Sequence, residues 1–218
     1  MMPNNKEQHE ELLSLYREIK AVIRARFDDF HRFRSEGTED ELFRELVFCL
    51  LTPQSGARRC GTALQLLCDR GLLFDGRKEE VSSAINTVRF KNTKAENILR
   101  ARELFRGDGP GLRVFLTKTN NPAETRARLV SGVRGMGYKE AGHFMRNTGF
   151  GDDLAILDRH ILRSLAALGV IDAVPPSLPP RLYLNIERKM KVFSLSLGIP
   201  IHHLDFVLWY RRTGDIYK

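Results

Sequence analysis

Apolar residues recur at intervals of three and four along most of this chain. Between Glu11 and Phe27 they occupy positions 12, 15, 19, 22, 23 and 27. This spacing is typical of a helix that buries one face against a core. No stretch alternates apolar and polar residues between hairpin turns, so strands are not expected. The pattern predicts an all-α fold with about ten helices.

Local signals predict where several of these helices begin and end. Thr38 with Glu41, and Thr93 with Glu96, have capping-box spacing and predict helices that open there and run to Leu51 and to Phe105. Pro53 and glycine-containing turns separate the helices. The remaining helices are predicted over residues 55–68, 79–88, 122–133, 138–147, 159–168, 180–197 and 200–210.

The predicted helices group into two subdomains. Residues 37–150 are expected to form a central, barrel-like helical unit, and residues 1–36 together with 151–218 to form a second unit, with a cleft between the two. The segment 174–180, VPPSLPP, has four prolines in seven residues. It cannot be helical inside and is the best candidate for a linker.

Charge adds a first indication of the partner. The 218 residues include 35 Lys and Arg against 27 Asp and Glu, a net charge of +8 and a pI near 9.6. The excess is concentrated in residues 89–106, with six basic and two acidic residues, and in 126–146, with five and one. Such a balance favours a nucleic-acid partner, although a merely basic protein has the same arithmetic.

Other classes of function are disfavoured. The three cysteines at positions 49, 60 and 68 form no CxxC pair, so neither a zinc nor an iron–sulfur site is expected. No apolar run approaches the roughly 18 residues of a membrane span. The N-terminal residues lack the pattern of a signal peptide, and an intracellular protein without a metal or organic cofactor is expected.

The segment from Leu129 to Asn147 predicts two helices joined by a short turn. Gly135 and Gly137 flank Met136, which is expected to point inward and lock the helices together. Backbone N–H groups beside the start of the second helix favour an anion, so this arrangement is typical of a hairpin that binds a DNA phosphate. The alternative is an ordinary helical connection that contains glycines.

Four strings then resemble a known family: GVRGMGYK at 132–139, AILDRH at 155–160, RFKNTKAENI at 89–98 and FVLWYRRTGDIYK at 206–218. They resemble the helix–hairpin–helix DNA glycosylases, most closely the compact 8-oxoguanine DNA glycosylase/lyase branch of archaea and some bacteria. The resemblance implies that Lys139 is the nucleophile and that Asp158, 19 residues later, assists it. Taken alone, Lys139 could instead contact phosphate, and Asp158 could simply cap a helix.

The same resemblance implies residues for the base pocket. The C-terminal Lys218, with its carboxylate, is expected to line the pocket that reads 8-oxoguanine. Trp209 and Phe90 are the candidates for stacking on a flipped base, although Trp209 also fits a core position. Gln54 is expected to fill the hole that the flipped base leaves, or else to be a plain loop residue. His143, one helical turn beyond Lys139, is expected to face the cleft.

Together these features predict a monomeric enzyme that excises 8-oxoguanine from duplex DNA through a lysine Schiff base and nicks the strand by β-elimination. No cysteine follows Cys68, which argues against the iron–sulfur branches of the superfamily. Arg134 stands where many hairpins of the superfamily have proline, a departure from the endonuclease III pattern. A glycosylase for oxidised pyrimidines and a non-catalytic hairpin protein remain as alternatives.

Overall fold

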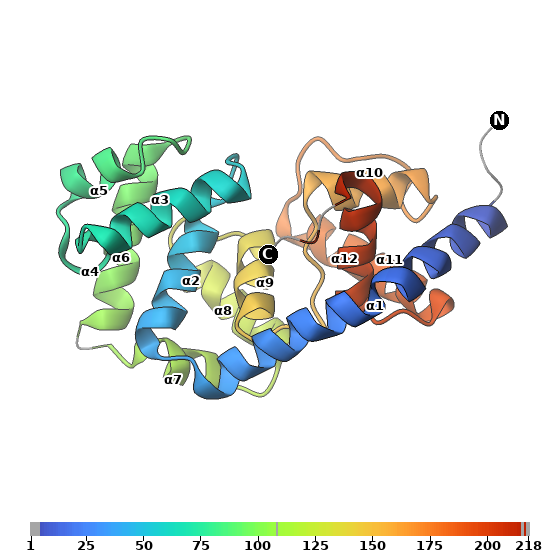
Figure 1. Ribbon diagram of the computed structural model, residues 1–218, viewed down its shortest axis with the longest axis horizontal. Coiled ribbons are helices and arrows are strands. Elements are labelled where there is room, and N and C mark those ends of the chain that lie inside the picture. Colours follow the sequence, from blue (N-terminus) through green and yellow to red (C-terminus); the bar gives the residue numbers. More distant parts are fainter. Residues whose placement is uncertain (1–4, 108, 215, 217–218) are drawn as a thin grey trace.

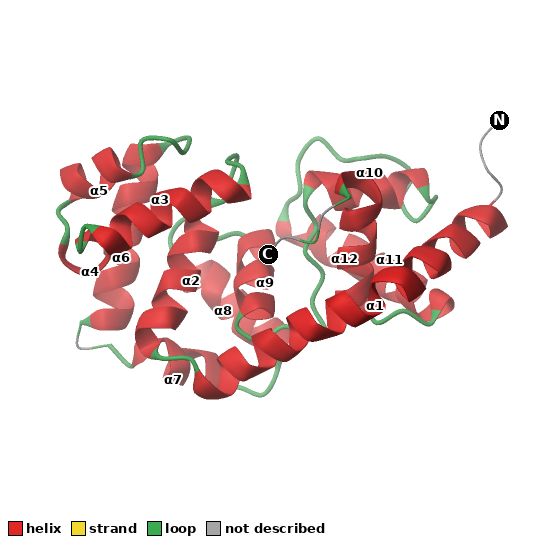
Figure 2. Ribbon diagram, viewed as in Figure 1, coloured by secondary structure: helices red, strands yellow, loops and turns green. Residues whose placement is uncertain are grey.

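Helices make up the regular structure of the protein. The computed structural model describes residues 5–107, 109–214 and 216, and within these ranges it contains helices and no strands (Figures 1 and 2). The prediction of an all-α fold is confirmed. The helices are α1 (Asn5–Glu36), α2 (Glu39–Leu51), α3 (Ala57–Asp69), α4 (Leu72–Asp75), α5 (Lys78–Ala84), α6 (Lys91–Arg106), α7 (Gly111–Thr117), α8 (Pro122–Gly132), α9 (Tyr138–Asn147), α10 (Arg159–Ala167), α11 (Pro180–Leu197) and α12 (Ile201–Thr213).

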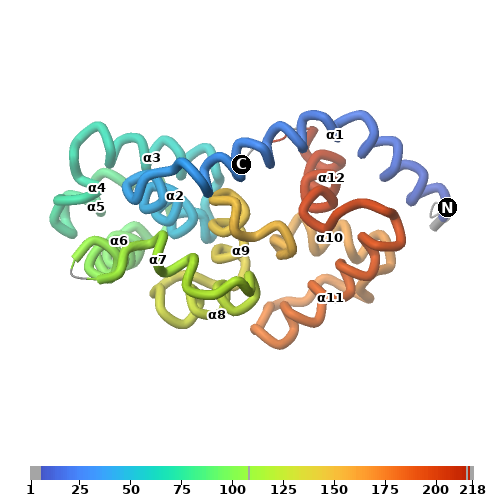
Figure 3. Tube along the Cα trace, turned by 90° about the horizontal axis from the view of Figure 1, so that it is seen from below, coloured from blue at the N-terminus to red at the C-terminus, as the bar shows by residue number. Residues whose placement is uncertain are grey.

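Two hydrophobic cores organise these helices. The first core contains buried side chains between Leu42 and Leu154, from α2 to α9 and the turn after α9. The second core combines α1 with residues from Ala155 to Leu208. Figures 1 and 3 show the two groups of helices side by side, with α1 running along both. The first and last described helices, α1 and α12, therefore meet in the second core.

The capping signals had different outcomes. Thr38 and Glu41 form the predicted capping box at the start of α2. The box predicted for Thr93 and Glu96 was wrong, because α6 already begins at Lys91 and is preceded by Phe90 in the left-handed conformation, with φ 58°. The carboxylate of Glu96 instead pairs with Arg100 and Arg134.

Two short helices, α4 and α7, were not predicted. They have four and seven residues, too few for an apolar period to repeat. The first helix is longer than predicted: it has a mostly polar extension before Glu11, and after Phe27 it continues with buried Phe30 to Glu36. The proline-rich segment 174–180 lies between α10 and α11 within the second group of helices and so does not link the two cores.

Membrane-spanning potential is confined to one helix pair. Of the described helices, none is by itself long and apolar enough to cross a bilayer, and only α11 with α12, which meet at 90°, pass that test as a pair on length and composition.

Candidate active site

A cavity of about 810 Å³ opens between the two cores. Its walls come from the loop after α2, the start of α9, the start of α10, the proline-rich segment and α12. Lys139 and Asp158 both line it, so the structure brings together the two residues predicted to carry the chemistry. The other lining residues used below are Thr52, Gln54, His143, Arg146, Asp205 and Trp209.

Lys139 lies in the first turn of α9, and its side chain is 25% exposed. Its Nζ donates to Thr52 Oγ1 at 3.4 Å and lies 3.8 Å from Glu140 Oε1. Thr52 is fixed in turn, because its hydroxyl donates to the carbonyl of Cys49 at the end of α2. The amine is therefore held at the cavity wall by one long hydrogen bond and keeps access to the cavity.

Asp158 is the N-cap of α10. Its Oδ1 accepts from the backbone N–H groups of His160 and Ile161, both at 2.8 Å. Capping by a carboxylate fixes the side chain and is favoured by the positive end of the helix dipole. Because both bonds end on Oδ1, Oδ2 is not needed for capping. Asp158 can therefore cap α10 with Oδ1 and still present Oδ2 to the cavity.

The turn between α8 and α9 has the predicted hairpin form. Gly135 has φ 85°, and a Cβ at this position would lie 2.0 Å from Asn97 Nδ2. Gly137 is the N-cap of α9, and Met136 between them is buried. Arg134, in this turn, pairs with Glu96 of α6. A salt bridge therefore ties the turn to the first core.

A second charged pair lies deeper in the cavity wall. Arg146 of α9 donates to Asp205 of α12 at 2.6 Å, and both side chains are buried. Burial raises the pKa of the Asp205 carboxyl to about 6; Arg146 opposes this rise, whereas the charge of Asp158 adds to it. This pair joins the two cores beneath the cavity.

Among the described residues, no group of three or more His, Cys, Asp or Glu side chains is placed to hold a metal ion. The charged groups that line the cavity are instead the Lys139 amine, the Arg146 and Arg159 guanidinium groups and the carboxylates of Glu140, Asp158 and Asp205.

Comparison with known proteins shows the family of the chain. A family model described as 8-oxoguanine DNA glycosylase matches residues 23–199, most of the chain. The chain belongs to the 8-oxoguanine DNA glycosylase family. It is 40% identical over 213 residues to the 8-oxoguanine DNA glycosylase/AP lyase of Fusobacterium nucleatum, covering 97% of this chain and 98% of that protein. It is 36% identical to the protein of the same name from Methanocaldococcus jannaschii, covering 92% and 94%.

Solved structures of the 8-oxoguanine DNA glycosylase family have the same fold. The crystal structure of the Thermotoga maritima enzyme superimposes with a TM-score of 0.87 at 32% identity and covers 99% of this chain and 100% of that one. The M. jannaschii glycosylase/lyase in complex with a 15mer DNA containing 8-oxoguanine gives a TM-score of 0.87 at 32% identity, covering 97% and 100%.

The other residues predicted for the family's base pocket fall in different places. Trp209 is half-buried, lines the cavity and makes an edge contact with His160 at 4.8 Å. His143 also lines the cavity, but it is buried against Phe48. Gln54 lies at the wall with φ 54°. Phe90 does not line the cavity and is 56% exposed. Lys218 lies outside the described residues.

Sequence reasoning missed several cavity residues. Thr52 contacts Lys139, yet a threonine before a proline has no signal that sets it apart. Asp205 and Arg146 are distant in sequence, and only the fold pairs them. The proline-rich segment was interpreted as a linker, but Arg159 binds the carbonyls of Pro175 and Pro176 at 3.2 and 3.1 Å and folds the segment over the cavity.

Proposed function

We propose that this protein excises 8-oxoguanine from duplex DNA and then nicks the strand as an AP lyase. The observation that carries the proposal is that Lys139 and Asp158 line one cavity between the cores in a member of the 8-oxoguanine DNA glycosylase family. Binding alone would need neither an amine in that cavity nor a carboxylate beside it.

Lys139 supplies the nucleophile. The lone pair of a neutral Nζ attacks the sugar C1′ as the C1′–N9 bond breaks. The base leaves with the electron pair of the broken C1′–N9 bond and takes up a proton. Nζ loses a proton and the sugar ring opens at O4′, giving a Schiff base. Loss of a C2′ proton then expels the 3′ phosphate by β-elimination, and water releases the lysine. The contact of Nζ with Thr52 Oγ1 orients the amine before attack.

Asp158 provides negative charge where positive charge develops. During departure of the base the sugar becomes oxocarbenium-like, and a fixed carboxylate stabilises that state without reorganising. Capping by His160 N and Ile161 N gives the rigidity that this role requires. Asp158 also accepts and returns protons as Lys139 changes between amine and imine.

Recognition of the base follows from the rest of the wall. Trp209 offers a ring face to a base that has left the stack, and His143 and Gln54 supply polar groups around it. Unlike guanine, 8-oxoguanine carries a hydrogen on N7, so an acceptor there selects the lesion. A main-chain oxygen of Lys218 is the proposed acceptor. Phe90, outside the cavity, is available to duplex DNA rather than to the extruded base.

The hairpin holds the duplex. Gly135 permits the left-handed turn and Gly137 caps α9, so the turn presents to a phosphate the start of α9, where helix N–H groups and the dipole favour an anion. Because Lys139 belongs to the same turn of α9, gripping the phosphate also sets the nucleophile against the damaged strand. We propose that a single chain performs the whole reaction.

Borohydride trapping on a duplex with one 8-oxoguanine tests the proposal. The wild-type protein should form a covalent adduct, and Lys139→Gln should form none while still binding the duplex. Asp158→Asn should slow excision by about 100-fold or more, because the general acid–base and electrostatic contributions are lost. Failure of the wild-type protein to form an adduct, or normal cleavage by Lys139→Gln, would contradict the mechanism.

The substrate is tested with a panel of duplexes that differ only in the lesion. Preference for 8-oxoguanine over oxidised pyrimidines is expected. Removal of Lys218 should reduce the ratio of 8-oxoguanine to guanine excision, because the acceptor facing N7 is lost. A stronger reaction with an oxidised pyrimidine would overturn the substrate, and unchanged selectivity would remove the tail from the pocket.

A further inference from the structure

Lys94 of α6 is a buried lysine that the proposed mechanism does not use. Only 4% of the residue is exposed. Its Nζ donates to the carbonyls of Leu51 and Pro53 at 2.6 and 2.8 Å and to Ser55 Oγ at 3.0 Å. An ammonium has three donors, and here all three bind the segment that follows α2. Lys94 belongs to the basic stretch 89–106, whose charge favoured a DNA partner, but its ammonium group binds within the protein. Its contacts with Leu51, Pro53 and Ser55 form the Lys94 joint.

This joint completes the end of a helix. The carbonyl groups in the last turn of a helix have no partner within it, and a cation at that end is favoured. Cys60 Sγ also donates to the carbonyl of Leu51, at 3.2 Å. The segment 52–55 forms one wall of the cavity. Hydrogen bonds from Lys94 of α6 and Cys60 of α3 thus hold this segment and the helix end before it.

The same joint holds a second loop. Ser55 Oγ, which accepts from Lys94, also accepts from the backbone N–H of Arg89 at 3.1 Å. The backbone N–H of Lys94 donates to the carbonyl of Phe90 at 2.9 Å. This bond is the first backbone bond of α6 and does not need the lysine side chain. The side chain of Lys94 therefore fixes the loop after α2 directly and the loop before α6 through the shared hydroxyl of Ser55.

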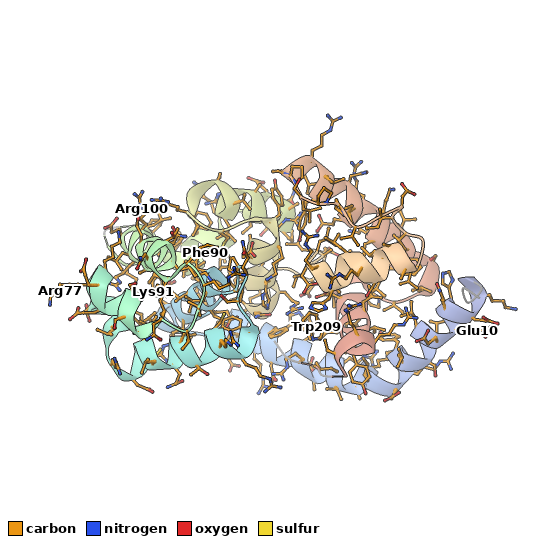
Figure 4. All side chains as sticks on the ribbon, turned by 90° about the horizontal axis from the view of Figure 1, so that it is seen from above. Glu10, Arg77, Phe90, Lys91, Arg100 and Trp209 are labelled. Carbon is orange, nitrogen blue, oxygen red and sulfur yellow. The ribbon has the colours of Figure 1, made fainter. Side chains whose placement is uncertain are left out.

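Each of these loops carries one residue in an unfavourable conformation. Among the described residues, Gln54 and Phe90 are the only non-glycine residues with positive φ, at 54° and 58°. Both side chains are exposed, so burial of their own side chains does not compensate for this strain. Figure 4 shows Phe90 beside Lys91 on the first group of helices and Trp209 on the second group. Strain of this kind persists only where surrounding structure imposes it, and it concentrates at functional sites.

We infer that Lys94 is a positioning residue for base extrusion: it holds Gln54 and Phe90 in the conformations that meet the opened duplex. The inference rests on the proposed glycosylase function. Base extrusion should depend on Lys94, whereas attack by Lys139 should not. The reason is that Thr52, which contacts Lys139, is held by its own bonds to the Cys49 carbonyl at 2.8 and 3.3 Å. Loss of Lys94 should therefore impair removal of a stacked base far more than cleavage at an abasic site, where no base has to leave the stack.

The decisive experiment compares two substrates under single-turnover conditions with saturating enzyme. Lys94→Met should lower the rate of 8-oxoguanine excision by about 10–100-fold, as expected for loss of hydrogen bonds to a charged group. Its rate of nicking a preformed abasic site should stay within about threefold of the wild type. The matched control is Lys91→Met, an exposed lysine on the same helix, which should change both rates by one common factor.

A milder variant covers the case in which Lys94→Met fails to fold. Ser55→Ala removes the hydroxyl shared by Lys94 and Arg89 and leaves both carbonyl contacts of Lys94 in place. It should slow excision by about 3–10-fold with no matching loss at abasic sites. A 2-aminopurine next to the lesion should brighten more slowly in both variants, because its fluorescence reports base extrusion.

Two results overturn the inference. One is an equal loss on both substrates in Lys94→Met or Ser55→Ala, which indicates a general structural role. The other is wild-type excision in Ser55→Ala or in a folded Lys94→Met. If the wild-type protein itself does not excise 8-oxoguanine, the proposed function fails instead, and the variants are then not informative about Lys94.

Discussion

At the scale of single residues, Gly135 is the most constrained position of the hairpin. Gly135→Ala should destabilise the protein by at least about 1–2 kcal/mol, the cost of a left-handed conformation for an L-residue. The new Cβ would also lie 2.0 Å from Asn97 Nδ2, so the buried amide has to move. Urea unfolding measures the stability, and titration with duplex DNA should show weaker binding because the phosphate-binding turn is displaced.

Gly132 provides the matched control for this substitution. It lies at the end of α8, and a Cβ there meets nothing within 4 Å. Gly132→Ala should leave the free energy of unfolding unchanged or raise it by up to about 1 kcal/mol, because alanine favours the helix. Equal destabilisation by the two substitutions would contradict the specific constraint at Gly135.

Single residues also show which features of the structure can be predicted from the sequence. The hairpin glycines and the capping box at Thr38 are local features, so their pattern predicts their structure. The exposure of individual charges is not local. The basic residues at 89–106 and 126–146 were interpreted as a DNA-facing excess, but Lys94, Arg126 and Arg146 are buried. Their partners lie between about 40 and 60 residues away in sequence, where no spacing rule applies.

At the scale of elements, α1 and α12, the first and last described helices, pack against each other. Tyr16 and His203 are hydrogen-bonded at 2.8 Å between these two helices, and the ring of Phe27 packs on His203. Burial lowers the pKa of His203 from 6.5 to about 4, and nearby cationic side chains act in the same direction. The folded protein therefore keeps this imidazole neutral at a pH where the unfolded chain protonates it.

This difference predicts a loss of stability in acid. As pH falls from 6.5 towards 4, the unfolded chain binds a proton that the folded protein excludes, so unfolding becomes easier. His203→Gln removes the titration and keeps an acceptor for Tyr16. Between about pH 7 and about pH 4.5 the wild type should lose about 2–3 kcal/mol more than the variant, measured by urea unfolding. Parallel pH profiles would show that His203 does not contribute.

Elements also differ in how well their sequences predict them. Long amphipathic helices such as α11 repeat their apolar period several times and were predicted at their observed ends. The cavity wall between α10 and α11 was not predicted, because four prolines specify only that the segment is not helical. Its position over the cavity depends on two bonds from Arg159, which the sequence alone does not reveal.

At the scale of the whole molecule, a second ion pair connects the two cores, in addition to Arg146 and Asp205. Arg126 of α8 is fully buried and donates through both Nη atoms to Glu187 of α11, at 2.6 Å each. Glu187 also accepts from Ala155 N at 2.8 Å, where the chain passes from the first core to the second. The guanidinium lies 5.1 and 5.5 Å from the rings of Tyr138 and Tyr183, which also line the cavity. A charge pair with a fully buried guanidinium and a largely buried carboxylate therefore lies between the two cores.

Breaking this pair from one side should be costly. Glu187→Gln leaves a buried guanidinium without its counter-charge and should lower the free energy of unfolding by about 3–5 kcal/mol. The double replacement Arg126→Met with Glu187→Met should cost clearly less than the sum of the single ones, because no charge is then left buried. Urea unfolding of the wild type, Arg126→Met, Glu187→Met and the double variant completes the cycle, and Glu187→Gln is measured beside them. Because the pair adjoins Tyr138, which precedes the nucleophile, 8-oxoguanine excision should fall in Glu187→Gln even at temperatures where it remains folded. Additive stabilities with unchanged excision would show that the cores hold their positions without it.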